Sequence, residues 1–80
     1  MDQQVLDRVI EQIRAVFESK SASAPAHLDA TTALDQSLGF ESLDFAELVV
    51  RLEDEFGKDP FAANPVPQAS TVGGLAALYE

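Results

Sequence analysis

The sequence predicts an all-α fold, a small helical bundle of three main helices plus room for a short fourth, with a long loop between helices one and two. Two long segments carry apolar residues at helical spacing, and no segment alternates as a strand does. Pro25 and Gly39 lie between these segments, and Gly57 and Pro60 follow the second one. Because 80 residues can build only one core, we expect residues 1–80 to form a single domain.

The first predicted helix covers residues 3–19. Polar and charged residues fill one side of it, and the other side is apolar. The apolar side consists of Val5, Val9, Ile13, Val16 and Phe17, with Leu6 and Ile10 beside them. Residues 19–27 are mostly small and polar and include Pro25, so this segment ends the helix.

A long ordered loop is expected up to Gly39. Thr32, with Asp35 three residues later, resembles the cap of a short helical turn. Long loops are uncommon in compact domains and are often functional. Three apolar residues are expected to attach the loop to the core, namely Leu28, Leu34 and Leu38.

The second predicted helix covers residues 42–56, with Gly57 and Pro60 as stop signals. A helical wheel gives it a core side made of Phe45, Leu48, Val49, Leu52 and Phe56. Leu43 and Val50 fall on the acidic opposite side. Such a pair fits a docking surface as well as a solvated face on which Arg51 pairs with Glu47 or Glu55.

The remainder of the chain predicts one more helix. Residues 61–69 contain two prolines, so at most one short helical turn fits there. Ser70 or Thr71 can cap a last helix that runs to about Tyr79. Its expected core residues are Val72, Leu75, Leu78 and Tyr79.

The composition excludes several classes of function. A net charge of −9 opposes binding to nucleic acid and to anionic membranes, and no apolar run is long enough to span a membrane. Without cysteine the chain has no disulfide, which fits the cytoplasm. No motif of a hydrolase, a nucleotide-binding loop or a metal site is present, and His27 fits a surface loop residue. We therefore expect neither an enzyme nor a metal site.

Ser42 stands where the loop ends and the second helix begins. Serine is a favoured N-cap, which alone accounts for most serines at such positions. A helix N-terminus also stabilises an anion, so a phosphodiester on this hydroxyl would lie in a favourable field. Position alone leaves both interpretations open, with the cap favoured.

The segment LGFESLDFAELVVRLEDEFG (38–57) resembles the signature of acyl carrier proteins, in which a serine opens the second helix. The likeness extends loosely along the chain, through LDATTAL (28–34) and TVGGLAALYE (71–80). It implies covalent 4′-phosphopantetheine, taken from coenzyme A, attached at Ser42. It also implies that this arm carries an acyl-type cargo as a thioester.

The resemblance implies a set of partners as well. They are a phosphopantetheinyl transferase, an acyl-loading ligase or transferase, and downstream biosynthetic enzymes with basic docking patches. The recognition surface would be formed by residues of the second helix and its approach, here called the docking face: Glu41, Leu43, Asp44, Glu47, Val50, Glu53 and Asp54. Two exposed apolar residues are too few for a large self-interface, so we expect a monomer.

Some residues depart from the family pattern. Glu41 replaces the usual aspartate, Phe45 is bulky where a smaller residue is common, and residues 58–68 are rich in proline and alanine. These departures count against housekeeping fatty-acid synthesis and leave a fatty-acid-like, polyketide or specialised biosynthetic pathway, the last with its own loading ligase. Two alternatives stay open: an aminoacyl or peptidyl carrier of non-ribosomal synthesis, and an unmodified acidic adaptor.

Overall fold

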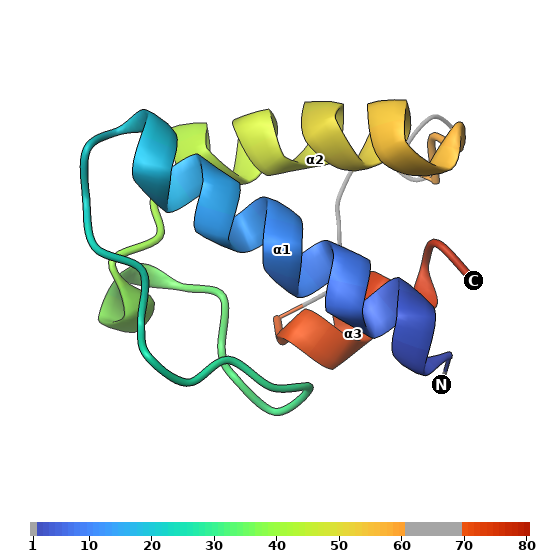
Figure 1. Cartoon of the computed structure of the whole chain (residues 1–80), viewed down its shortest axis with the longest axis horizontal. Helices are drawn as coiled ribbons and strands as arrows, with labels where there is room; N and C mark the ends of the chain where they lie inside the picture. Colours follow the sequence, from blue (N-terminus) through green and yellow to red (C-terminus); the bar gives the residue numbers. More distant parts are fainter. Residues whose placement is uncertain (1, 61–69) are drawn as a thin grey trace.

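A computed structural model describes residues 2–60 and 70–80. Along the chain lie helix α1 (Gln3–Ser19), the short 3-10 helix η1 (Gln36–Leu38), helix α2 (Ser42–Phe56) and helix α3 (Val72–Ala77). α1 packs against both α2 and α3, and the long loop lies at one end of the bundle (Figure 1). The described residues contain no strand, which confirms the all-α prediction, while the short fourth helix expected within 61–69 lies outside them.

The core forms where α1 meets the other two helices. Its buried residues from the helices are Leu6, Val9, Ile13, Val16 and Phe17 of α1, Leu48 and Leu52 of α2, and Val72, Leu75 and Ala76 of α3. Leu28, Phe40 and Tyr79 complete it from the loops. The predicted core side of α1 is confirmed, and that of α2 is confirmed for Leu48 and Leu52, with Phe45 and Phe56 packed at the edge, whereas Val49 is only partly buried and does not belong to the core cluster.

The prediction that Leu78 belongs to the core is wrong. Leu78 is 41% exposed, because α3 ends at Ala77 and does not continue to Tyr79. The chain then turns so that Tyr79 enters the core, where its ring lies 5.4 Å from that of Phe56. Burial raises the pKa of the Tyr79 hydroxyl to about 12.

The helix ends follow the chemistry of their flanking residues. The carboxylate of Asp2 caps α1 by accepting from the N–H of Gln4. Gly57 ends α2 with φ +67°, a left-handed conformation that glycine adopts without steric cost. Thr71 caps α3 by accepting from the N–H of Gly74 at 3.1 Å. It is one of the two residues that the sequence predicts as this cap.

The loop between α1 and α2 is fixed at several points. Arg14 of α1 donates to the carbonyl of Pro25 at 2.8 Å, and Leu28 is buried. The loop also meets the start of α3, where Ala33 forms an isolated antiparallel bridge with Thr71. Leu34 and Leu38 pack partly buried against the core, so all three predicted anchors are confirmed.

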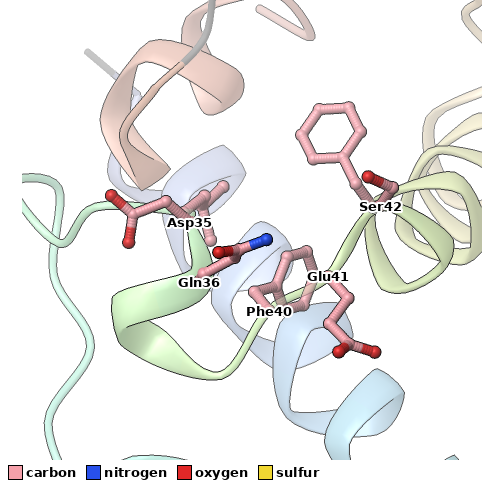
Figure 2. Close-up of a pocket in the computed structure, with 7 residues that line it drawn as sticks. Asp35, Gln36, Phe40, Glu41 and Ser42 are labelled. Atoms are coloured by element: carbon pink, nitrogen blue, oxygen red, sulfur yellow. The ribbon is translucent and has the colours of Figure 1, made fainter.

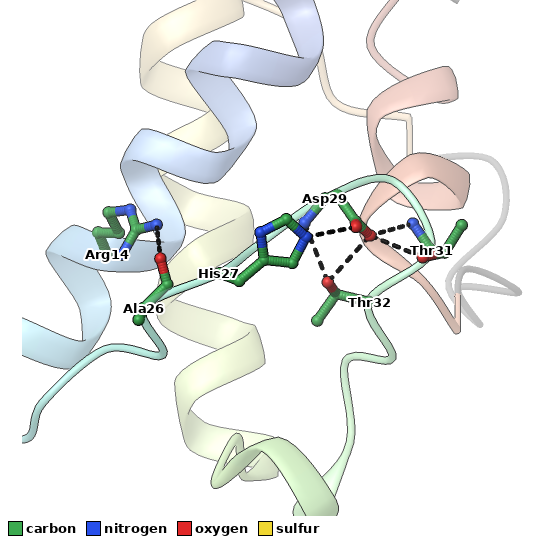
Figure 3. A network of polar contacts seen from close by, with 6 residues as sticks. All are labelled: Arg14, Ala26, His27, Asp29, Thr31 and Thr32. Atoms are coloured by element: carbon green, nitrogen blue, oxygen red, sulfur yellow. Dashed lines mark hydrogen bonds and ion pairs between the residues drawn. The ribbon is translucent and has the colours of Figure 1, made fainter.

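The loop contains a short helical turn, but it begins after Asp35 and not after Thr32 as predicted. Thr32 closes a tight turn with Asp29, whose carboxylate also accepts from Thr31 and approaches the ring of His27 (Figure 3). These bonds lower the pKa of Asp29. The helical turn is η1, and Asp35 itself caps it by accepting from the N–H of Ser37 at 2.9 Å. A short polar side chain at the first position of a turn bonds two residues ahead, which explains the difference.

No helix within the described residues is long and apolar enough to cross a membrane.

Candidate functional site

Ser42 is the first residue of α2 and is exposed. The cap interpretation of this serine is wrong, because the N-cap is Glu41, whose N–H donates to the carboxylate of Asp44 at 2.9 Å. In this capping box, the side chain three residues after the N-cap accepts from the N–H of the N-cap residue. The hydroxyl of Ser42 makes no hydrogen bond to any described residue, so local folding leaves it available for chemistry.

Lys20 holds Asp44 in place. Its ammonium lies 2.6 Å from the Asp44 carboxylate and donates to the carbonyl of Gly39 at 2.8 Å. The side chain of Asp44 is only 12% exposed. The hydrogen bond from Lys20, together with the one from the Glu41 N–H, lowers the pKa of Asp44. Local sequence patterns do not identify Lys20, because its partners Gly39 and Asp44 are distant in the sequence.

The carboxylate of Glu47 also accepts hydrogen bonds from other residues of the chain. It accepts from the hydroxyl of Ser19 at 2.8 Å and from Arg51 at 3.0 Å. The Ser19 bond is the main cause that lowers the pKa of Glu47, and Arg51 adds to it. The prediction that Arg51 pairs within its own helix is confirmed for Glu47. Glu55 instead faces Arg8 of α1 at 3.8 Å.

The remaining residues of the docking face are exposed. Leu43 is 82% and Val50 66% exposed, so both point away from the core as the helical wheel predicted. Glu41, Glu53 and Asp54 are also exposed and form no ion pair with the described residues. Of the seven docking-face residues, five are exposed, whereas Asp44 and Glu47 are partly buried and pair with Lys20 and Arg51. Glu41, although exposed, also takes part in the capping box of α2.

A cleft of about 310 Å³ opens beside Ser42 (Figure 2). It lies between the residues of η1 and the first turn of α2. Its lining combines apolar and polar side chains, namely Leu34, Asp35, Gln36, Phe40, Glu41, Ser42 and Phe45. Figure 2 shows the amide of Gln36 extending into the space between the two walls, whereas the carboxylate of Glu41 points away.

Phe40 fixes the approach to Ser42 and was not anticipated. Its side chain is 3% exposed, and its ring centroid lies 5.7 Å from that of Phe17. The preceding residue, Gly39, has φ +87° and ends η1, which allows the chain to turn Phe40 inward. A single aromatic residue after Leu-Gly carries no periodic signal, so helical spacing could not identify it.

The described residues contain no group of three or more His, Cys, Asp or Glu side chains placed to hold a metal ion. His27 is an exposed loop residue, as expected, and lies 2.7 Å from Asp29.

Comparison with known families adds one finding. The family model of the phosphopantetheine attachment site matches residues 11–78, which covers most of the chain and includes the cleft and Ser42. No solved structure matches the chain significantly.

Proposed function

Because the chain belongs to the phosphopantetheine attachment site family and is thus a phosphopantetheine-bearing carrier protein, we propose that Ser42 is the residue that bears the arm. The observation that carries the proposal is the state of its hydroxyl. It is exposed at the first position of α2, and it has no role in capping the helix. Members of this family attach 4′-phosphopantetheine covalently and are typically carriers without catalysis of their own.

The surroundings of Ser42 fit a phosphodiester. The first turn of a helix 15 residues long presents N–H groups and the positive end of its dipole to a group on the first side chain. Asp44 lies nearby, but its charge is compensated by Lys20 at 2.6 Å. Lys20 therefore lowers the repulsion that a phosphate on Ser42 would meet.

The attachment step uses Ser42 as a nucleophile. Its Oγ forms a bond to the pantetheine-bearing phosphorus of coenzyme A, and the bond from that phosphorus to the nucleotide half breaks. The nucleotide half leaves with its phosphate, and a base of the transferase takes the serine proton. When attached, the group supplies a long arm with a terminal thiol that holds cargo as a thioester.

The docking face supports transfer between enzymes. Leu43 and Val50 offer apolar contact, and the exposed Glu41, Glu53 and Asp54 offer negative charge to basic partner surfaces. The chain carries −9, which speeds encounters with a basic transferase or ligase and leaves release rapid. These partners are a phosphopantetheinyl transferase, an acyl-loading enzyme and downstream biosynthetic enzymes.

The cargo class in this proposal is acyl, within a specialised fatty-acid-like or polyketide pathway of the cytoplasm. The acidic GFESLD approach to Ser42 supports acyl over aminoacyl cargo. Val50 and Leu43 are the two large apolar residues exposed on α2, which supports a monomer.

Intact-protein mass spectrometry tests the attachment. The chain is incubated with coenzyme A and a broad-specificity phosphopantetheinyl transferase, beside the variants Ser42→Ala and Ser23→Ala. Ser23 is an exposed loop serine and serves as the matched control. We expect one phosphopantetheine mass on the wild type and on Ser23→Ala, and none on Ser42→Ala. A gain that persists in Ser42→Ala would overturn the assignment.

A further inference from the structure

We propose that Lys20 is a displaceable cover of the docking-face carboxylate Asp44, and that a partner enzyme with an arginine beside its active site takes the place of Lys20 there. The inference rests on the proposed attachment at Ser42 and on the docking face. It names the chemical group by which a partner is recognised. It also links recognition to release of the segment that leads into Ser42.

Asp44 is largely covered in the free chain. It lies two residues after Ser42, in the first turn of α2, yet its side chain is only 12% exposed. The end of α1 lies beside this turn (Figure 1), and the ammonium of Lys20, the C-cap residue of α1, is 2.6 Å from the carboxylate. An enzyme that acts on Ser42 therefore finds the carboxylate two residues further along occupied by a cation of the carrier itself.

Asp44 differs in this respect from Glu47, the other paired acid of the docking face. Glu47 pairs with Arg51 one turn along the same helix, and its side chain remains 42% exposed. A partner can reach Glu47 without moving Arg51, whereas Lys20 must leave before a partner reaches Asp44. Of these two acids, only Asp44 requires the exchange of one cation for another.

The bonding of Asp44 favours arginine as the replacement. The Lys20 ammonium and the Glu41 N–H both donate to Oδ2 of Asp44, and Oδ1 accepts no hydrogen bond from the described residues. Lysine offers a point charge, whereas the planar guanidinium of arginine forms two parallel bonds with the two oxygens of a carboxylate. An incoming arginine thus gains a bond at Oδ1 that Lys20 does not make.

Lys20 can leave at small cost. Its side chain is 31% exposed and has a flexible four-carbon stem, so the ammonium can reach water without a change in α1. A partly exposed ion pair contributes little net free energy, because water replaces much of the lost attraction. The other contacts of the ammonium are the Gly39 carbonyl and the ring of Phe17, whose centroid lies at 5.0 Å. The cover is therefore formed in the free chain and open to exchange in a complex.

Displacement of Lys20 frees the approach to Ser42. The ammonium donates to the carbonyl of Gly39 at 2.8 Å, and Gly39, with φ +87°, is where the chain turns from η1 toward α2. This bond is lost when the ammonium leaves, so residues 39–41 gain freedom beside the serine on which the enzyme acts. The coupling is reciprocal, because closure of Lys20 on Asp44 weakens the partner's hold by the same free energy. Return of Lys20 therefore favours dissociation of the partner.

Calorimetric titration of the apo chain tests the exchange, with a broad-specificity phosphopantetheinyl transferase that carries an arginine in its docking patch. Lys20→Met is compared with Arg8→Met, which loses the same charge on α1 and faces Glu55 at 3.8 Å, away from the docking face. Both variants are more negative than the wild type and gain affinity through the overall field. We expect Lys20→Met to bind about threefold more tightly than Arg8→Met, the scale of one partly exposed ion pair. Equal affinities of the two variants would overturn the inference.

The Asp44→Asn background separates the exchange from general attraction. Without the carboxylate, Lys20 has no acid to cover, so Lys20→Met and Arg8→Met should then raise the affinity equally. An advantage of Lys20→Met that persists in this background would place the effect away from Asp44 and contradict the inference. Urea unfolding of each variant verifies that it is folded under the conditions of the titration.

NMR of the wild-type chain gives a second readout that does not depend on the folding of a variant. The sequence contains two lysines, Lys20 and Lys58, so 13C-labelled lysine gives two Cε signals. Lys58 donates to the carbonyls of Tyr79 and Glu80 and serves as the internal control. On titration with unlabelled transferase, the Lys20 signal should move away from its position in the free chain, while the Lys58 signal stays. A Lys20 signal that keeps its free position in the saturated complex would show that the cover is not displaced.

The two proposals fail in different ways. If the transferase neither binds nor loads the chain at Ser42, the proposed function and the cover both fail. If Ser42 is loaded while Lys20 keeps its contact with Asp44 in the complex, only the cover fails.

Discussion

The ammonium of Lys20 lies 2.6 Å from the carboxylate of Asp44 and thereby joins the end of α1 to the first turn of α2. The same ammonium donates to the carbonyl of Gly39 and lies 5.0 Å from the ring centroid of Phe17. These contacts fix the segment that leads into Ser42. One lysine therefore sets the orientation of the residue that we propose as the attachment site.

Replacing this lysine should loosen the approach to α2. Lys20→Met keeps an apolar stem over Phe17 and removes both polar contacts. We expect a loss of about 1 kcal/mol in the free energy of unfolding, because the pair is only partly exposed. Urea unfolding of the wild type and of Lys20→Met at neutral pH measures this loss in the free energy of unfolding.

Arg8→Met provides the control for that measurement. Arg8 lies 3.8 Å from Glu55 and its side chain is 56% exposed, so its loss should cost less than the loss of Lys20. Equal losses in the two variants would show that the Lys20 contacts carry no special stability.

Asp44 should also make stability depend on pH. The pKa of Asp44 is lower in the folded chain, chiefly through Lys20, than the value of about 3.9 of an unfolded aspartate. Its contribution is therefore complete above the unfolded pKa and is lost as the pH falls through the folded pKa. We expect the difference in urea midpoint between wild type and Asp44→Asn to be largest near pH 6 and to shrink below pH ~4. A difference that grows on acidification would contradict this sign.

The sequence could predict the helices because their signals are local. Apolar spacing together with the stop signals Pro25, Gly57 and Pro60 placed α1 at residues 3–19 and α2 at residues 42–56, and the structure has the same bounds. It could not place Leu78, since the end of α3 at Ala77 depends on how Tyr79 packs against Phe56. Helical spacing describes one face of a regular helix and does not report where the chain leaves that helix.

The candidate site also combines features that local sequence patterns predict with features that they do not. The exposure of Leu43 and Val50 followed from the helical wheel. The preference of serine for N-caps pointed to Ser42, whereas the N-cap of α2 is Glu41, whose N–H donates to Asp44, itself held by Lys20. Which residue caps α2 depends on a contact between residues that are far apart in the sequence, and local patterns cannot reveal such a contact.

Because Glu41 and not Ser42 is the N-cap of α2, substitutions at Ser42 and Asp44 should differ in their effect on stability. Ser42→Ala should change the free energy of unfolding by less than about 0.5 kcal/mol, because its hydroxyl bonds to no described residue. Asp44→Ala should cost about 1 kcal/mol or more, since it removes the acceptor of the Glu41 N–H and of Lys20. Thermal and urea unfolding of both variants measure this. A larger loss in Ser42→Ala than in Asp44→Ala would restore the serine as the cap.

The last prediction concerns recognition by the transferase. Leu43 is 82% exposed next to Ser42, so it makes few contacts in the folded chain and is well placed to contact an enzyme acting on that serine. Leu43→Ala should lower kcat/KM for phosphopantetheine loading about tenfold, the scale of one buried interface leucine. Its unfolding should remain unchanged, which urea titration checks. Leu78→Ala is the matched control, because Leu78 is 41% exposed and lies beyond α3, outside the docking face. Loading of Leu43→Ala at the wild-type rate would remove Leu43 from the interface. A loss shared by both variants would indicate a wider contact surface that includes the C-terminal turn.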